Sequence, residues 1–328
     1  MTGVQLANKK IGIIGFGNQA SRIISILDES IEFKIEKIFH PSKKLSDSRC
    51  TNELKDLYKY DCIFILSPNQ THFEYIFELL NNFDGYIFCE KPPVIENSEL
   101  MKLEKISTSN KKRIFFNFNF RFSKISEIIE KELKEKRIGS IININIISTH
   151  GLAFKKEYKN SWRSDAIHNK YSVLDTVAIH YLDLIVYHFN KIENYVHFPN
   201  IISKNGTSYD TSSLLLRSND LSSSIFCSYA SPKINEIIII GTNGYITIRD
   251  GNETVFGPRD TFDSKGFFIN PPKIYSEKID FDKEYEKSLK KSIQYFLECV
   301  KNKNSLNEND FRKSILSTKL LMNIKKNS

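Results

Sequence analysis

The fold of this chain is decided by the stretch Ile11-Gly12-Ile13-Ile14-Gly15-Phe16-Gly17-Asn18-Gln19-Ala20. It opens with an apolar run, which is typical of a parallel strand buried on both faces. A G-x-G-x-x-A element follows, and apolar residues at helical spacing come next. The first glycine permits a tight turn, the second lets the backbone approach a pyrophosphate, and the helix N-terminus offers donors to phosphate. A chance glycine turn is the alternative. The pattern predicts these cofactor-binding residues: Gly15, Phe16, Gly17, Asn18 and Gln19.

Beyond this stretch, strands and helices alternate as far as about residue 121. Expected strands at 35–39, 62–66, 85–89 and 113–118 are separated by helical patterns, including one at 97–108. Alternation of this kind predicts a parallel sheet with right-handed crossovers. After residue 121 strands follow strands, and Asn243-Gly244 indicates a hairpin. We therefore expect an α/β protein with a dinucleotide-binding domain at 1–121 and a substrate-binding α+β domain at 122–328.

Composition narrows the class of protein. The chain has 328 residues, which suggests two domains, and its 40% hydrophobic and 26% charged content excludes a wholly disordered or fibrous chain. The net charge is +8, but the lysines are scattered among glutamates. Because nucleic-acid binding needs clustered basic residues with interleaved aromatics, we expect no nucleic-acid partner. A solvated surface with room for one anionic small ligand is the simpler interpretation.

Five cysteines are spread along the chain without a C-x-x-C pair. An odd, widely spaced set predicts neither a disulfide framework nor a zinc site, so no metal is expected. The first residues lack a signal-peptide core, and no apolar run reaches the roughly 18 residues of a membrane span. We expect a reduced, cytoplasmic setting and no membrane association.

The end of the second strand bears on the choice of dinucleotide. An acidic residue there would bind the ribose 2′-hydroxyl of NAD, but the sequence reads Phe39-His40-Pro41-Ser42-Lys43-Lys44. His40, Ser42 and Lys43 would suit a 2′-phosphate, which favours NADP(H) slightly over NAD. The alternative is that the two lysines are ordinary loop charges.

Several further motifs follow along the chain, and their order is informative. They are Ser67-Pro68-Asn69-Gln70-Thr71-His72, Glu90-Lys91-Pro92, Asn117-Phe118-Asn119-Phe120-Arg121-Phe122, Trp162-Arg163, the stretch 175–183 and Gly241-Thr242-Asn243-Gly244. Together with the glycine turn they resemble the Gfo/Idh/MocA family of NAD(P)-dependent sugar and polyol oxidoreductases. The resemblance runs from about residue 10 to the final helix. It implies a Rossmann domain that binds NAD(P) and a C-terminal α+β domain with an open, mostly antiparallel sheet. That sheet usually covers a subunit interface, so a homodimer or homotetramer is implied.

The resemblance also implies catalytic roles. Lys91, in the Glu90-Lys91-Pro92 motif, would lie beside the nicotinamide and the substrate, where an ammonium can stabilise a developing alkoxide. A surface ion pair with Glu90 is the alternative. His180 matches the substrate-side general acid/base, and an imidazole titrates in the range that this role requires. A core histidine bonded to backbone is its alternative.

The sequence departs from the family pattern ahead of His180. An acidic residue or Asn commonly stands four positions before the histidine, but Thr176 occupies that position and Asp175 lies five positions before it. Four residues along an α-helix share a face, whereas five turn away by about 140°. Either Asp175 still points inward or Thr176 replaces the acid.

The remaining motifs have implied contacts. Cofactor-side residues are Ser67, Pro68, Asn69, His72 and Glu90, and substrate-side residues are Asn119, Arg121, Trp162 and Arg163, with simple packing as the alternative for Trp162. The implied reaction is reversible oxidation of a secondary alcohol on a sugar, polyol or nucleotide-linked sugar, with surface-glycan synthesis as a setting. A non-catalytic NAD(P)-binding sensor or regulator is the alternative function. A third option keeps the enzyme class with an imine or a trans-dihydrodiol as substrate.

Overall fold

The structure is a computed structural model that describes residues 9–42, 47–280 and 283–328. Its contacts form two compact units. The first contains the described residues up to Phe118 together with Lys290–Lys319, and the second contains Asn119–Leu289 together with Leu320–Ser328. This division differs from the expected boundary at 121/122, chiefly because the segment 290–319 joins the first unit. Its Phe296 packs against Phe64 of the first sheet with ring centroids 5.3 Å apart, which burial of aromatic surface favours.

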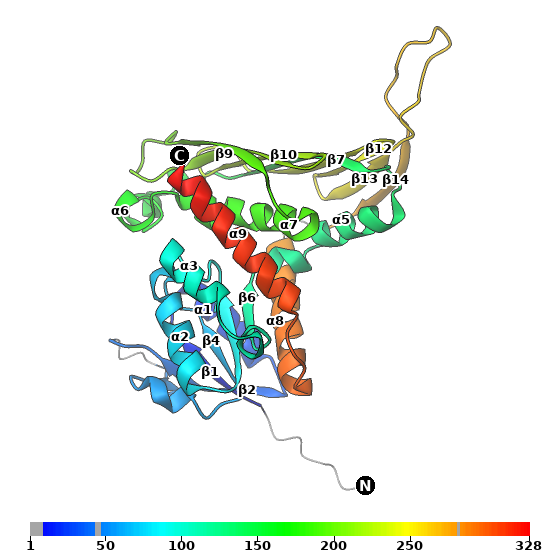
Figure 1. Cartoon of the computed structure of the whole chain (residues 1–328). Helices are drawn as coiled ribbons and strands as arrows, with labels where there is room; N and C mark the ends of the chain where they lie inside the picture. Colours follow the sequence, from blue (N-terminus) through cyan, green and yellow to red (C-terminus); the bar gives the residue numbers. More distant parts are fainter. Residues whose placement is uncertain (1–8, 43–46, 281–282) are drawn as a thin grey trace, which may run out of the picture. The chain divides into compact units, whose positions relative to one another are not determined.

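The first unit contains an all-parallel sheet, as the alternating pattern predicted (Figure 1). Its strand order among the described residues is β3-β2-β1-β4-β5-β6. The direction of sheet growth reverses between β1 and β4, and ligands of such sheets bind at the carboxyl ends of the strands beside this point. The strands are β1 (Lys9–Ile14), β2 (Phe33–Phe39), β3 (Cys50–Thr51), β4 (Cys62–Ile65), β5 (Tyr86–Glu90) and β6 (Ile114–Asn117).

Helices pack on this sheet through apolar stripes. The helix α1 buries Ala20, Ile23, Ile24 and Leu27. The helix expected at 97–108 is instead two pieces, because Glu96 and Glu99 cap the start of the first and the Ser107 hydroxyl caps the second. The helices are α1 (Asn18–Asp28), α2 (His72–Asn82), α3 (Asn97–Glu104), α4 (Thr108–Lys111) and the portions within 290–319 of α8 (Glu284–Asn302) and α9 (Glu308–Lys326).

The second unit contains a mostly antiparallel sheet, which confirms the expected fold class. The described order is β14-β13-β12-β11-β7-β10-β9-β8, in which β7 and β10 form a parallel pair. The expected hairpin joins β11 to β12 through the loop Thr242-Asn243. The strands are β7 (Ile141–Thr149), β8 (Asn194–Asn200), β9 (Thr211–Ser218), β10 (Leu221–Ser228), β11 (Ile234–Gly241), β12 (Gly244–Arg249), β13 (Asn252–Phe256) and β14 (Lys273–Lys278).

One face of this sheet is covered by helices (Figure 1). They are α5 (Lys124–Glu135) and α7 (Ile179–Phe189), and a π-helical turn at Leu174–Ala178 leads into α7. The short helix α6 (Ala166–Asn169) lies in the preceding loop. The opposite face exposes apolar side chains, among them Val196 and Leu215, which are directly paired across β8 and β9. The family resemblance implied an open sheet, and this face has that character.

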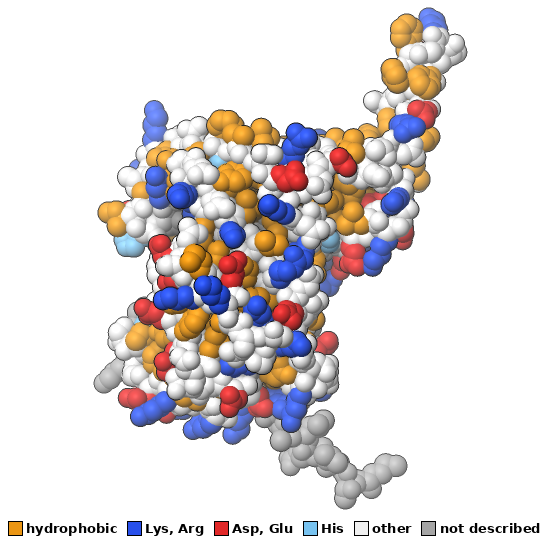
Figure 2. All heavy atoms as spheres, viewed as in Figure 1, with side chains coloured by type: hydrophobic (Ala, Val, Ile, Leu, Met, Phe, Trp, Pro, Cys, Tyr) orange, Lys and Arg blue, Asp and Glu red, His pale blue; other side chains and the backbone are white. Residues whose placement is uncertain are grey.

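Two surface features complete the description. The connection between β13 and β14 extends away from the sheet and carries exposed Phe262, Phe267 and Phe268 (Figure 1). On the face seen in Figure 2, lysine and arginine side chains are interspersed with aspartate and glutamate. None of the described helices is long and apolar enough to cross a membrane. The five cysteines are all free thiols.

Candidate active site

The carboxyl-terminal edge of the parallel sheet gathers the residues expected to bind the cofactor. Gly15 follows β1, His40 follows β2 and Lys91 follows β5. Strand register aligns these ends, since Ile14 pairs with both Phe39 and Ile65. Because neighbouring parallel strands end at one edge, segments far apart in sequence meet there.

The two positions of the G-x-G element are occupied by glycine for different structural reasons. Gly15 has a φ of +99°, and a β-carbon on it would lie 2.7 Å from the Ser67 nitrogen, so a side chain is excluded by both strain and space. Gly17 has an ordinary φ, and a β-carbon there would meet no protein atom within 4 Å. Gly17 also caps α1 without a side-chain acceptor for the first-turn N–H groups. An open, donor-lined position of this kind fits a dinucleotide pyrophosphate.

The residues around the second glycine are accessible to different degrees. Asn18 is exposed and Phe16 is half-buried. The Gln19 side chain turns inward, where its Nε2 donates to Glu90 Oε1 at 3.2 Å. Phe16 and Asn18 therefore remain available to a cofactor, whereas the Gln19 amide is engaged with the end of β5.

Glu90, which was expected beside the cofactor, is the centre of a buried polar network. Its Oε1 accepts from Asn117 Nδ2 at 2.7 Å as well as from Gln19, and Asn117 Oδ1 accepts from the Ser292 hydroxyl at 2.8 Å. Burial raises the pKa of Glu90, and the donor from Asn117 and the charge of Lys91 oppose the rise. Since Glu90 is buried, a surface ion pair does not describe Lys91, which is half-buried directly after it.

His72, a second residue expected on the cofactor side, is fully buried. The side chain has no exposed surface, and its ring nitrogens lie 2.8 Å from the Pro92 carbonyl oxygen and 3.0 Å from that of Ser67. Burial lowers the pKa of His72, and the nearby charge of Lys91 acts in the same direction. His72 therefore links the loops after β4 and β5 and positions Lys91 indirectly. No atom of it is left at the surface for a ligand.

The loop after β4 keeps its accessible residues. The Thr71 hydroxyl donates to the Ser67 hydroxyl at 2.7 Å and to the Pro68 carbonyl at 2.8 Å, which closes a short 3₁₀ turn at Asn69–Thr71. Asn69 is half-buried and Pro68 exposed. Both follow β4 at the edge where the expected cofactor residues gather, and their contact with the cofactor stays a prediction.

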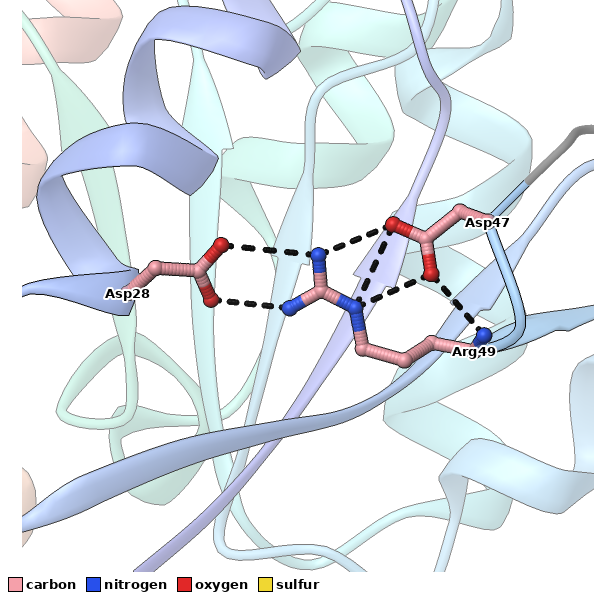
Figure 3. A network of polar contacts seen from close by, with 3 residues as sticks. All are labelled: Asp28, Asp47 and Arg49. Carbon is pink, nitrogen blue, oxygen red and sulfur yellow. Dashed lines mark hydrogen bonds and ion pairs between the residues drawn. The ribbon is translucent and has the colours of Figure 1, made fainter.

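A charge network that the sequence did not suggest lies beside the end of β2, formed by the last residue of α1 and the residues just before β3. The Arg49 guanidinium binds Asp28 at 2.8 Å and Asp47 at 2.9 Å (Figure 3). Hydrogen bonding to Arg49 lowers the pKa of Asp47, and both carboxylates raise the pKa of Arg49. His40 is half-buried and Ser42 exposed, while Lys43 lies outside the described residues. Two carboxylates on one guanidinium leave this network with net negative charge.

His180 lies in an aromatic enclosure within the second unit. Its ring stacks on Phe120 with centroids 4.5 Å apart, and Tyr285 meets it edge-on at 6.1 Å. The residue is 6% exposed. The packing comes from the 3₁₀ turn Asn119–Phe122 and from the first turn of α8, so the ring orientation is well defined.

The segment ahead of His180 resolves the spacing question in an unexpected way. The Ile179 N–H donates to the Leu174 carbonyl, five residues back, so this turn is π-helical. A π turn places residues five apart one above the other, as an α turn does for residues four apart. This geometry favours Asp175 over Thr176 for the helix face that carries His180. The Thr176 hydroxyl is engaged elsewhere, with the Ser172 carbonyl at 2.6 Å and with the Tyr229 hydroxyl.

Two residues expected to contact the substrate have buried side chains that bind partners inside the protein. Arg121 binds Asp183 through Nε at 2.9 Å and Nη2 at 2.7 Å, and the two side chains are 5% and 0% exposed. The Asn119 amide donates to the Ser288 hydroxyl at 2.8 Å and is also buried. Neither side chain reaches the surface, and their hydrogen bonds anchor α7 and α8. A substrate contact by either residue stays a prediction.

The other expected substrate residues stay accessible and have partners that the sequence reasoning missed. Trp162 is 47% exposed and lies 4.6 Å from the Arg163 guanidinium. Arg163 hydrogen-bonds to Tyr229, whose ring stacks on His150 at 5.0 Å. His150 and Tyr229 directly follow the parallel strands β7 and β10, so their adjacency could have been found from strand ends.

Comparison with known families agrees with this architecture. The model described as "Oxidoreductase family, NAD-binding Rossmann fold" matches residues 9–118, and that of the GFO/IDH/MocA C-terminal domain matches residues 127–247. The chain belongs to the Gfo/Idh/MocA family. It is an oxidoreductase whose first domain binds NAD(P), and the predicted family and fold class are confirmed.

Solved structures share the whole fold at low identity. An oxidoreductase from Agrobacterium radiobacter, in complex with NAD+, L-tartaric acid and magnesium, is 16% identical with a TM-score of 0.77, covering 98% of this chain and 96% of its own. Myo-inositol 2-dehydrogenase from Lactobacillus plantarum is 17% identical with a TM-score of 0.74, covering 98% and 97%. Myo-inositol dehydrogenase from Corynebacterium glutamicum is 16% identical with a TM-score of 0.73, covering 98% and 97%. No curated protein sequence is significantly similar.

Proposed function

We propose that this protein is an NAD(P)-dependent dehydrogenase acting on a secondary alcohol or ketone of a sugar, polyol or nucleotide-linked sugar. The observation that carries the proposal is Lys91 at the end of β5, on the same sheet edge as the open cradle at Gly17. His180, held between Phe120 and Tyr285, supplies a second proton-transfer group. Surface-glycan synthesis and a cytoplasmic location remain part of the proposal.

The chemistry divides between cofactor and protein. The bound nicotinamide supplies or accepts the hydride. Oxidation of a carbinol also removes the hydroxyl proton, and ketone reduction returns one to the oxygen. We assign the proton transfer to His180 and stabilisation of the developing alkoxide charge to Lys91. Glu90 and His72 hold the backbone on either side of Lys91, because each is fixed by hydrogen bonds to neighbouring loops or strands.

For the cofactor, we propose a slight preference for NADP(H), based on His40, Ser42 and Lys43. The net negative charge of the Arg49 network acts against a 2′-phosphate, so the two features are in competition. Fluorescence titration with NADH and NADPH at fixed salt decides between them. Tighter NADPH binding supports the loop assignment, and tighter NADH binding overturns it while leaving the dehydrogenase proposal intact.

We also propose a homodimer or homotetramer formed through the open face of the second sheet. Val196, Leu215 and Phe226 expose apolar surface there, and interfaces of stable oligomers bury such surface. Light scattering after size-exclusion chromatography gives the oligomeric state. Leu215→Glu should dissociate the oligomer, and an unchanged mass in that variant would place the interface elsewhere.

The test of the proposed reaction is Lys91→Met. We expect turnover to fall by about 10²–10⁴-fold, with NAD(P)H affinity largely kept, because the substitution removes a charge that acts on the reacting oxygen. Lys55→Met is the matched control, since the Lys55 side chain is 75% exposed and distant in sequence from the motif. Turnover like that of the unmodified protein in the Lys91 variant contradicts the assignment.

A second candidate function is a non-catalytic NAD(P)-binding sensor. The observation that favours it is the altered segment ahead of His180, where Asp175 is bound by Lys325 and Thr176 by Tyr229. A screen of sugars, polyols and nucleotide-linked sugars with both cofactors separates the two functions. Steady turnover of any substrate removes the sensor, whereas cofactor binding without turnover of any of them favours it.

A further inference from the structure

The last turn of α9 binds the segment that leads into His180 through an ion pair and a hydrogen bond. Lys325 Nζ lies 2.5 Å from Asp175 Oδ1 and 2.7 Å from Oδ2, so the ammonium binds the carboxylate through both oxygens. The backbone takes part as well, since the Tyr171 hydroxyl donates to the Lys325 carbonyl at 2.8 Å. Lys325 Nζ also lies 6.0 Å from the centre of the Tyr171 ring. All of these groups belong to the second unit.

The ion pair is sheltered from water. The Asp175 side chain is 11% exposed and that of Lys325 is 25% exposed. An ion pair in such surroundings is screened less than one at the surface, and its geometry is more strongly defined. The two residues after α9 are also held in place, since Asn327 Nδ2 donates to the Tyr195 hydroxyl at 2.6 Å and the Ser328 hydroxyl lies 2.7 Å from His197 Nδ1.

The π turn gives this ion pair its significance. An α-helix over the same residues would turn Asp175 away from His180, whereas the observed turn brings the two onto one face. The extra residue that distinguishes this chain from the family spacing is thus absorbed by the π turn. On this face of the helix, the Asp175 carboxylate is paired with the Lys325 ammonium.

We propose that Lys325 is a positioning residue for the active site: it holds the Asp175 carboxylate in place and balances its charge beside His180. The proposal rests on the proposed function only for its catalytic consequence. The local electrostatic consequence depends on the ion pair alone. An anion near an imidazole favours the charged ring and a cation disfavours it, so the two members of the ion pair act on the ring in opposite directions.

Other groups face His180 from the elements packed around it. Phe120 and Tyr285 contribute rings, and Asp183, on the next turn of α7, is already paired with Arg121. These groups are unchanged by substitutions at Asp175 and Lys325. A change in the titration of His180 can therefore be attributed to the second ion pair.

The first experiment is titration of the histidine ring signals by NMR in the cofactor-free full-length protein. Seven histidines are present, and His180→Gln identifies the signal of His180 by its loss. Lys325→Met should raise the pKa of His180 by about half a unit or more, because it leaves the carboxylate unbalanced. Asp175→Asn should lower the pKa, because it leaves the ammonium, and the double variant should return near the original value. Lys325→Arg should keep it.

Controls and catalysis complete the test. Lys326→Met, an exposed neighbour in the same turn, should change nothing. If Lys325→Met does not fold, Asp175→Asn and Lys325→Arg still carry the titration. In turnover, Lys325→Met should lower kcat by about ten- to a hundredfold at unchanged KM, with recovery in Lys325→Arg.

The outcomes separate the two proposals. An unchanged His180 titration in both Lys325→Met and Asp175→Asn overturns the inference, whatever the turnover. Shifts in the expected directions without any turnover by the unmodified protein support the ion pair's action on His180 and overturn the proposed function. Shifted titration with unchanged kcat in Lys325→Met overturns the catalytic part of the inference.

Discussion

The sharpest prediction concerns Arg121, for which the family resemblance implied a substrate contact and which has a buried side chain in the structure. Arg121→Met removes a guanidinium that binds Asp183 through two hydrogen bonds of 2.9 and 2.7 Å. The Asp183 carboxylate has no exposed surface, so water cannot replace the lost partner. Its charge would remain buried and unpaired on α7, the same helix that carries His180.

The expected cost follows from that burial. Removing one partner of a buried ion pair typically costs about 3–5 kcal/mol. For a unit of this size, each kcal/mol lowers the melting temperature by roughly 2–4 °C, which gives a drop of roughly 6–20 °C. Arg121→Met combined with Asp183→Leu should recover much of the loss, since an apolar pair leaves no uncompensated charge. Arg121→Lys should lie between, because an ammonium cannot reproduce the two parallel hydrogen bonds.

Thermal unfolding by circular dichroism measures these changes, and steady-state kinetics on the same samples gives KM and kcat. A destabilised Arg121→Met variant, rescued by the second substitution, supports the interior role. If Arg121→Met instead melts like the unmodified protein but has a strongly raised KM, then Arg121 contacts substrate and our assignment is refuted.

Three further predictions concern the first unit. Gly17→Ala should keep the melting temperature while NAD(P)H affinity falls by at least about tenfold. Gly15→Ala should lower the free energy of unfolding by at least about 1–3 kcal/mol, because Gly15 has a positive φ. Equal effects of the two substitutions on stability would contradict the distinction. Because the folded-state pKa of Glu90 is raised above its ordinary 4.5, Glu90 costs stability above that pH and none well below it. In urea unfolding, the free energy of unfolding of Glu90→Gln should therefore increase relative to that of the unmodified protein as pH rises through about 4.5, by at most ~1.4 kcal/mol per pH unit. A difference that stays constant with pH would show that Glu90 does not titrate in this range. His72→Ala should lower kcat more than NAD(P)H affinity, since it frees the Pro92 carbonyl next to Lys91, and an affinity loss alone in titration would indicate direct cofactor contact.

The sequence was sufficient for the architecture of each unit, because the deciding signals are local. An apolar run followed by Gly15 and Gly17 defines a strand, a turn and a helix within ten residues. Alternation of such units implies parallel pairing, and the change at about residue 121 implies a second kind of sheet. Strand ends then place Lys91 and Gly17 on one edge without any knowledge of side-chain packing.

The roles of individual side chains needed the tertiary structure. The sequence predicts Arg121 and His72 as ligand contacts, and only the tertiary structure shows that Arg121 is bound to Asp183 and His72 to the Pro92 carbonyl. Likewise, the segment 290–319 packs with a sheet whose strands lie far earlier in the chain, as the contact of Phe296 with Phe64 shows, and no local pattern encodes this pairing.

The spacing ahead of His180 shows the division most clearly. Sequence alone determined that Asp175 and Thr176 compete for one position, since helical periodicity leaves both open. The choice depends on a π turn and on Lys325, which lies 150 residues further along the chain. Periodicity describes how a residue relates to its neighbours in the chain, whereas the partner that holds a charge is set by which elements the fold brings together.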